Sequence, residues 1–183
     1  MKALLIRHAT SSGQAADAPL ADAGYAQSEA LIPILTSLGA GPLYASPYRR
    51  AQETIAPYAK ASGQTVSTLD GLRERLLSPV SLPDWQDHIR YSFFDALHAA
   101  SGGESHTHLF VRAANAFDHI TAVGGPLPTF VTHGGMTSAL FHRVDASFGF
   151  DAWKDLQNPD LFEVEITARK ITAFKRLNLE AQT

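Results

Sequence analysis

Short apolar runs alternate with segments of helical periodicity in the first part of the chain. Residues 1–6 form a mostly apolar run, which predicts a short strand covered on both faces. From residue 19 to residue 38, apolar side chains recur at helical spacing, and Gly39 supplies the end of a predicted helix. Within that segment, Pro33 is expected to bend the helix or break it early.

The same alternation continues after this helix. Residues 43–45 predict a second strand, and residues 49–61 are rich in helix formers and end at Gly63. Residues 65–69 alternate between apolar and polar side chains and predict a third strand. Strand, helix, strand and helix in this order indicate an α/β fold.

Residues 78–103 interrupt this pattern. Two prolines and two serines in residues 78–83 indicate a loop. The next apolar side chains lie four residues apart and predict one helical stripe, made by Trp85, Ile89, Phe93 and Leu97. We expect residues 78–103 to act as a helical lid within a chain that otherwise forms one domain over residues 1–183.

The second half returns to strands and helices. Apolar spacing predicts a helix over residues 105–123, a strand at 129–131 and a short helix at 136–144. Residues 161–167 and 170–174 predict a closing hairpin.

Composition narrows the functional classes. The chain has 183 residues and no cysteine, which excludes disulfides, thiolate metal ligands and a cysteine nucleophile. Its net charge of −3 argues against nucleic acid as the main partner. No apolar run is long enough to span a membrane, and no signal peptide is apparent at the first residues, so a soluble cytoplasmic protein is expected.

Candidate chemistry gathers at the carboxyl ends of three predicted strands. Arg7 and His8 follow the first strand, Ser46 and Pro47 follow the second, and His133 follows the strand at 129–131. Open α/β sheets collect their ligand sites at this edge. A histidine at a strand end, beside backbone N–H groups and an arginine fork, is suited to phosphate chemistry.

Several motifs together resemble the histidine phosphatase superfamily, also called the phosphoglycerate mutase-like family, and its small phosphatase branch. Six segments match in order. They are residues 4–9 (Leu-Leu-Ile-Arg-His-Ala), 19–28, 45–54 (Ala-Ser-Pro-Tyr-Arg-Arg-Ala-Gln-Glu-Thr), 72–74 (Leu-Arg-Glu), 103–105 with Arg112, and 132–135 (Thr-His-Gly-Gly). The resemblance implies a three-layer sandwich, with helices on both faces of a mostly parallel sheet.

The resemblance also implies a mechanism without metal or cofactor. His8 is then the nucleophile that forms a phosphohistidine, which water hydrolyses. Its other ring nitrogen must be held as a donor, for which a backbone carbonyl is the expected acceptor. Arg7, Arg50 and His133 are expected to surround the phosphoryl oxygens, with His133 acting as a compact cation if protonated. By motif register Arg50 is preferred over its neighbour Arg49.

The proton donor is less sharply defined by the sequence. Glu74 matches the acid of the family motif, although Arg73 and Arg75 flank it and an ordinary ion pair is the alternative. Glu104 is the second candidate, with helix capping as its alternative role.

Around the nucleophile, Ala9 replaces the usual glycine, and Gln14 stands where many relatives carry a phosphate-binding asparagine. Gln14, Ser11 and Gly134 are the remaining candidate phosphate or substrate contacts, together with Glu104. His106 and His108 are two residues apart, which on a helix puts them on different faces, so they are not expected to share a metal and no metal site is predicted. His106 is a candidate for the pocket rim.

The expected function is therefore hydrolysis of a small phosphomonoester, with a phosphorylated protein side chain as a second kind of substrate. Two alternatives stay open. One is phosphoglycerate mutase-type transfer, which the short chain disfavours. The other is a catalytically weak module that binds a phosphorylated ligand. The sequence also allows a homodimer.

Overall fold

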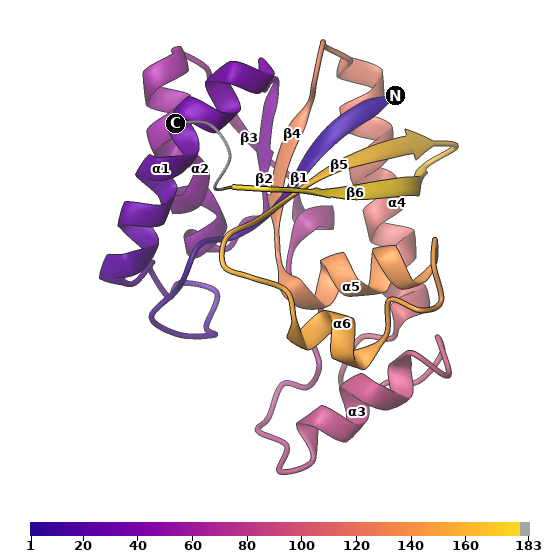
Figure 1. Cartoon of the computed structure of the whole chain (residues 1–183). Helices are drawn as coiled ribbons and strands as arrows, with labels where there is room; N and C mark the ends of the chain where they lie inside the picture. The colour runs from indigo at the N-terminus through magenta and orange to yellow at the C-terminus, as the bar shows by residue number, and fades with distance from the viewer. Residues whose placement is uncertain (180–183) are drawn as a thin grey trace.

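The structure is a computed structural model and describes residues 1–179. Figure 1 shows a central sheet with helices on two sides. The elements in chain order are β1 (Lys2–Arg7), α1 (Asp22–Leu38), β2 (Leu43–Ala45), α2 (Arg49–Ser62), β3 (Val66–Thr68), a 3-10 turn η1 (Asp70–Leu72), α3 (Trp85–Ser92), α4 (His106–Val123), β4 (Thr129–Thr132), α5 (Gly134–His142), α6 (Phe150–Lys154), β5 (Asp160–Thr167) and β6 (Lys170–Leu177).

Six strands make one mixed sheet in the order β3-β2-β4-β1-β5-β6. The pairs β3-β2, β2-β4 and β4-β1 are parallel, and β5 and β6 add an antiparallel hairpin beside β1. Because β1, β2 and β4 are neighbours and run the same way, the residues that follow them meet at one edge. This confirms the predicted α/β fold with a mostly parallel sheet.

Alternation along the strands builds two cores, one on each face of the sheet. Leu4 and Ile6 pack on one side with the buried residues of α1 and α2. Ala3 and Leu5 point to the other side, where α4 and α5 supply most of the cover. The three layers are visible in Figure 1, with α1 and α2 on the left and α4 on the right.

The helix boundaries follow simple backbone rules. α1 and α2 end at Gly39 and Gly63, whose left-handed conformations, with φ of 70° and 67°, favour glycine. α1 is one helix through Pro33, so of the two effects expected at Pro33, a bend or an early break, the break does not occur. The helix starts at Asp22, three residues after the predicted start at residue 19.

Two other differences concern the region around the predicted lid. α3 ends at Ser92, so Leu97, with 73% of its surface exposed, does not extend the helical stripe. The short helix α6 was not predicted, because five residues are too few to show a helical period. No helix within residues 1–179 combines the length and the apolar character that a membrane span requires.

Candidate active site

His8 lies at the carboxyl end of β1, where its backbone N–H donates to Thr132 O of β4 at 3.0 Å. The side chain is 7% exposed. Its Nδ1 lies 2.7 Å from the carbonyl oxygen of Ala9, as the sequence predicted. Burial, with the nearby Arg50 and Arg7 charges, lowers the pKa of His8 to about 3. The ring is therefore neutral at physiological pH, and with Nδ1 as the donor its Nε2 carries a lone pair.

Residues of the second and third motifs hold the loop that follows His8. The backbone N–H of Ala9 donates to Thr54 Oγ1 at 3.0 Å, and that of Thr10 donates to Gln27 Oε1 at 2.9 Å. Ala9 does not adopt a positive φ, so its Cβ is compatible with the backbone at this turn. At Gly24 of α1, an added Cβ would lie 2.0 Å from the carbonyl oxygen of Thr10.

This close approach makes Gly24→Ala a test of how α1 positions the loop. We expect the variant to displace Thr10, to lower stability by about 1 to 3 kcal/mol despite the higher helix propensity of alanine, and to lower turnover through the shift of His8. Urea unfolding and phosphatase assays measure the two effects. Gly13→Ala is the matched control, because its Cβ would meet only Ala18 Cβ at an ordinary 3.5 Å. Equal behaviour of the two variants would contradict this explanation.

Arg50 reaches His8 from the first turn of α2. Its Nε donates to Nε2 of His8 at 3.1 Å, and its Nη1 donates to the carbonyl oxygen of Ala15 at 2.8 Å. The side chain is 1% exposed and lies over the ring of Tyr48. The neighbouring Arg49 instead pairs with Glu53 at 2.7 Å, away from His8. The structure thus brings Arg50, and not Arg49, to His8.

His133 lies against His8, with ring centroids 5.1 Å apart. Its Nε2 is 2.7 Å from Ser46 Oγ, and its buried Nδ1 has no hydrogen-bond partner within the described residues. Burial and the surrounding positive groups hold the pKa of His133 well below its usual value. His133 is therefore neutral in this structure, and the condition under which it would act as a cation is not met.

Arg7 is held at the end of β1 by the carbonyl oxygen of Leu156, which accepts from Nη1 at 2.6 Å. Its Nε is buried and has no partner within the described residues. A Cβ at Gly134 would lie 3.1 Å from the guanidinium carbon of Arg7, so glycine allows the start of α5 to approach closely. Arg7 thus keeps a free N–H donor beside the N-terminus of a helix, an arrangement that favours anions.

Glu74 also meets the N-terminus of α5. Its carboxylate accepts from the backbone N–H groups of Gly135 at 3.0 Å and Met136 at 2.9 Å, and from that of Arg75 at 2.7 Å. Neither flanking arginine forms an ion pair with Glu74 within residues 1–179, so backbone donors hold it in place of the ordinary ion pair.

Glu104 has a different environment. Arg112 donates to its two carboxylate oxygens at 2.6 and 2.8 Å, and also to the carbonyl oxygens of Gly71 and Arg73. Burial alone would raise the pKa of Glu104. The hydrogen bonds to Arg112 and the charges of Arg112 and Arg73 outweigh this effect, so the pKa is lowered. Ser105, and not Glu104, caps α4 with its side chain. Glu104 therefore joins α4 to the segment that carries Glu74.

We expect Glu104→Gln to lower the free energy of unfolding by about 2 to 3 kcal/mol at neutral pH, because Arg112 loses its buried counter-charge. Since the folded pKa of Glu104 is lowered, this stabilisation is present above the unfolded pKa and is lost as pH falls through the folded value. Urea unfolding of both proteins from pH 7 to pH 3 measures the difference. A difference that stayed constant over this range would contradict the ion pair as its source.

A cavity of about 680 Å³ opens beside His8. Of the predicted residues, Arg7, His8, Ser11, Gln14, Glu74 and Gly134 line it. Arg50 and His133 contact His8 but, like Glu104, are not among the residues that line the cavity. Ser11 Oγ donates to Gly13 O, and the carbonyl oxygen of Gln14 accepts from Arg50.

The cavity also contains Asn158 and Trp153, which the sequence did not indicate, and Trp85, which belongs to the predicted lid. Asn158 lines it and donates from Nδ2 to the carbonyl oxygen of His8 at 2.6 Å. Trp85 and Trp153 form an edge-to-face pair in its wall, with ring centroids 6.0 Å apart. His106 lines it as well, which agrees with its suggested place at the rim. Within residues 1–179, no group of three or more His, Cys, Asp or Glu side chains is placed to hold a metal ion.

Solved structures of several phosphatases share this fold. A mycobacterial glucosyl-3-phosphoglycerate phosphatase in complex with inorganic phosphate is 22% identical, with a TM-score of 0.74 over 97% of this chain and 95% of that one. YhfR of Bacillus stearothermophilus is 21% identical, with a TM-score of 0.71 over 93% of each chain. A phosphoserine phosphatase of Entamoeba histolytica in complex with 3-phosphoglyceric acid is 16% identical, with a TM-score of 0.67 over 97% and 98%.

At these identities the structural likeness establishes the fold, and a comparison with curated protein sequences gives no significant match. The family is established by sequence. The profile described as the histidine phosphatase superfamily (branch 1) matches residues 3–179, which is nearly the whole chain. The chain therefore belongs to the histidine phosphatase superfamily.

Proposed function

We propose that this protein is a metal-independent phosphatase that hydrolyses a phosphomonoester through a phosphohistidine on Nε2 of His8. The observation that carries the proposal is the neutral His8 ring, fixed through Nδ1 by the carbonyl oxygen of Ala9 and in contact through Nε2 with Arg50. A histidine attacks phosphorus only with an unprotonated nitrogen that is correctly aimed. The lowered pKa of His8 supports the first condition, and the bond from Nδ1 to Ala9, which fixes the ring, supports the second.

In the first step, Nε2 of His8 attacks phosphorus and the bond from phosphorus to the ester oxygen breaks. Glu74 enters this step protonated and gives its proton to the leaving oxygen. The carboxylate left behind is then stabilised by the three backbone N–H groups that hold Glu74. Glu104 is the weaker candidate for the proton donor, because its carboxylate forms an ion pair with Arg112 and it does not line the cavity.

In the second step, water attacks phosphorus and gives a proton to the Glu74 carboxylate. The bond from phosphorus to Nε2 breaks, its electron pair returns to His8, and inorganic phosphate leaves. Arg50 donates to Nε2 in the substrate-free state, so its N–H must transfer to a phosphoryl oxygen when substrate binds. The free Nε–H of Arg7 and the neutral His133 ring complete the donors around that group.

The cavity favours a small molecule as the substrate. Its volume of about 680 Å³ falls in the range of sites for small ligands. α3, within the proposed lid at residues 78–103, contributes Trp85 and Ile89 to the wall. These side chains would contact the part of the substrate beyond the phosphoryl group.

The test is to trap the phosphoenzyme. Rapid mixing with 32P-labelled substrate, followed by quenching in alkali, is expected to give a labelled protein whose label is stable to base and lost in acid, as for a phosphohistidine. Peptide mapping should place the label on the peptide that contains His8. Turnover of p-nitrophenyl phosphate without such a label, or a label on another residue, would contradict the proposed mechanism. Binding without turnover on a broad panel of phosphomonoesters would instead indicate a binding module.

A further inference from the structure

Arg75 is a buried cation of the cavity that the mechanism does not use. It lines the cavity and is 8% exposed. Its Nε donates to the carbonyl oxygen of Glu104 at 2.9 Å, and its Nη1 donates to Ser92 Oγ at 2.7 Å. The Nη1 atom also lies 3.1 Å from Nε2 of His106. These contacts fix the guanidinium group between α3 and the start of α4.

Among the described residues, Arg75 has no carboxylate in direct contact with its guanidinium group, although the charges of Glu74 and Glu104 act on it. None of the ion pairs formed within residues 1–179 includes Arg75, and its Nη2 is buried without a hydrogen-bond partner there. Its neighbour Glu74 is turned to the N-terminus of α5. Burial of the guanidinium group is unfavourable and lowers the pKa of Arg75, because its hydrogen-bond partners are neutral and the charges of Glu74 and Glu104 offset only part of the lost hydration.

The surroundings of Arg75 differ from those of the phosphoryl site. Burial and the Arg75 charge lower the pKa of His106 to about 3, so this ring is a neutral neighbour. Ile89 and Phe93 line the same cavity and add apolar surface. Arg7 and Arg50, in contrast, are held by carbonyl groups from the loops around His8. The cavity therefore has a second cationic position on the side of α3 and α4.

We propose that Arg75 binds a second anionic group of the substrate, so that the substrate is a phosphomonoester with a further acid group, either a carboxylate or a second phosphate. This inference rests on the proposed function for its phosphoryl end. The Nη2 atom is covered in this structure. Binding therefore requires the guanidinium group to rotate out of its present contacts with Ser92 and His106, so that this donor reaches the anion.

Binding of phosphonates tests the second site without requiring turnover, since their carbon–phosphorus bond survives. We would titrate the protein by calorimetry with carboxyalkylphosphonates of two to four methylene groups, the alkylphosphonates of matched length, and the alkylene bisphosphonates. At least one doubly anionic compound is expected to bind about tenfold more tightly, or better, than its alkyl counterpart. Tighter binding of the carboxylate series or the bisphosphonate series identifies the source of the charge.

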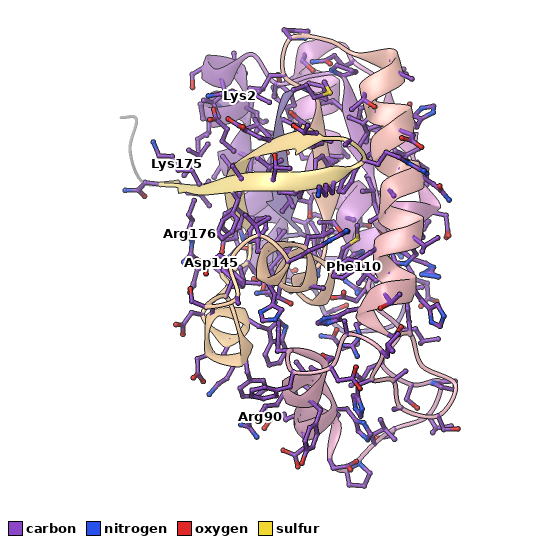
Figure 2. The ribbon with its side chains drawn as sticks, turned by 90° about the vertical axis from the view of Figure 1, so that its right-hand side faces the viewer. Lys2, Arg90, Phe110, Asp145, Lys175 and Arg176 are labelled. Carbon is purple, nitrogen blue, oxygen red and sulfur yellow. The ribbon has the colours of Figure 1, made fainter. Side chains whose placement is uncertain are left out.

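Arg75→Gln is expected to remove most of this preference. Arg90→Gln is the matched control, because it removes an exposed positive charge from α3 (Figure 2). Arg90 pairs there with Asp87. This control should keep the preference. Equal affinities of both compound types for the wild-type protein would overturn the inference, as would a preference that survives in a folded Arg75→Gln variant. A protein that binds with this preference yet hydrolyses no phosphomonoester would refute the proposed function and leave the anion site standing.

Discussion

Replacement of His8 by alanine is expected to lower kcat for p-nitrophenyl phosphate by about three orders of magnitude or more and to remove the phosphoenzyme label. The ring supplies the bond-forming electron pair, and no neighbour can substitute for it. His133 contacts His8, but its Nε2 is engaged with Ser46. Steady-state assays and the alkali-quench experiment measure the two losses on the same preparation.

His119→Ala is a suitable control for this variant, since His119 lies on the exposed face of α4 and contacts only the ring of Tyr44 among the described aromatic side chains. We expect it to keep the activity and the label of the wild-type protein. Thermal unfolding of both variants shows whether the fold is intact. Hydrolysis that persisted in a folded His8→Ala protein would remove His8 from the mechanism.

The parts of the fold that could be predicted are those that repeat a pattern over enough residues. β1 and the helix α4 show their periodicity directly, because one or both faces are buried. The hairpin of β5 and β6 was also predictable, although β6 extends to Leu177, beyond the predicted end at residue 174. The helix α6 was not, since a five-residue element gains its stability from contacts such as Trp153 with Trp85, which lie far apart in sequence.

The residues of the site also separate into those that the sequence could indicate and those that it could not. His8, Arg7 and Arg50 could be nominated because they occupy strand ends or a first helical turn within a recognisable motif. Asn158 gave no local signal, and its bond to the carbonyl oxygen of His8 spans 150 residues. The direction of the Arg75 side chain was equally hidden, because sequence shows its adjacency to Glu74 but not the choice of Ser92 as its partner.

Electrostatic states were the least accessible property. The charge of His133 depends on complete burial together with the positive groups that the fold brings beside it. A sequence motif names the residue but does not give its desolvation. Both histidines are neutral, and the positive charge of the site belongs to Arg7 and Arg50. The site therefore keeps the proposed nucleophile uncharged beside two cations, a combination suited to a phosphoryl dianion.

Replacement of Glu74 by glutamine is expected to have an effect that depends on the leaving group. Alkyl phosphates should lose about 10²- to 10⁴-fold in the rate of phosphoenzyme formation, because their alkoxide must be protonated as it leaves. p-Nitrophenyl phosphate should lose much less in this step, since nitrophenolate leaves without a proton. Single-turnover kinetics with both substrates measures the rate of phosphorylation separately from hydrolysis of the phosphoenzyme.

Glutamine retains only one acceptor for the N–H groups of Gly135 and Met136, so part of any loss arises from a shifted α5. The ratio of alkyl to aryl rates separates the two causes, because a displaced helix slows both substrates alike, whereas a missing proton slows mainly the alkyl phosphate. Glu104→Gln should lower stability and leave this ratio unchanged, since Arg112 holds Glu104 away from the leaving group. A changed ratio in Glu104→Gln, with none in Glu74→Gln, would transfer the role of proton donor to Glu104.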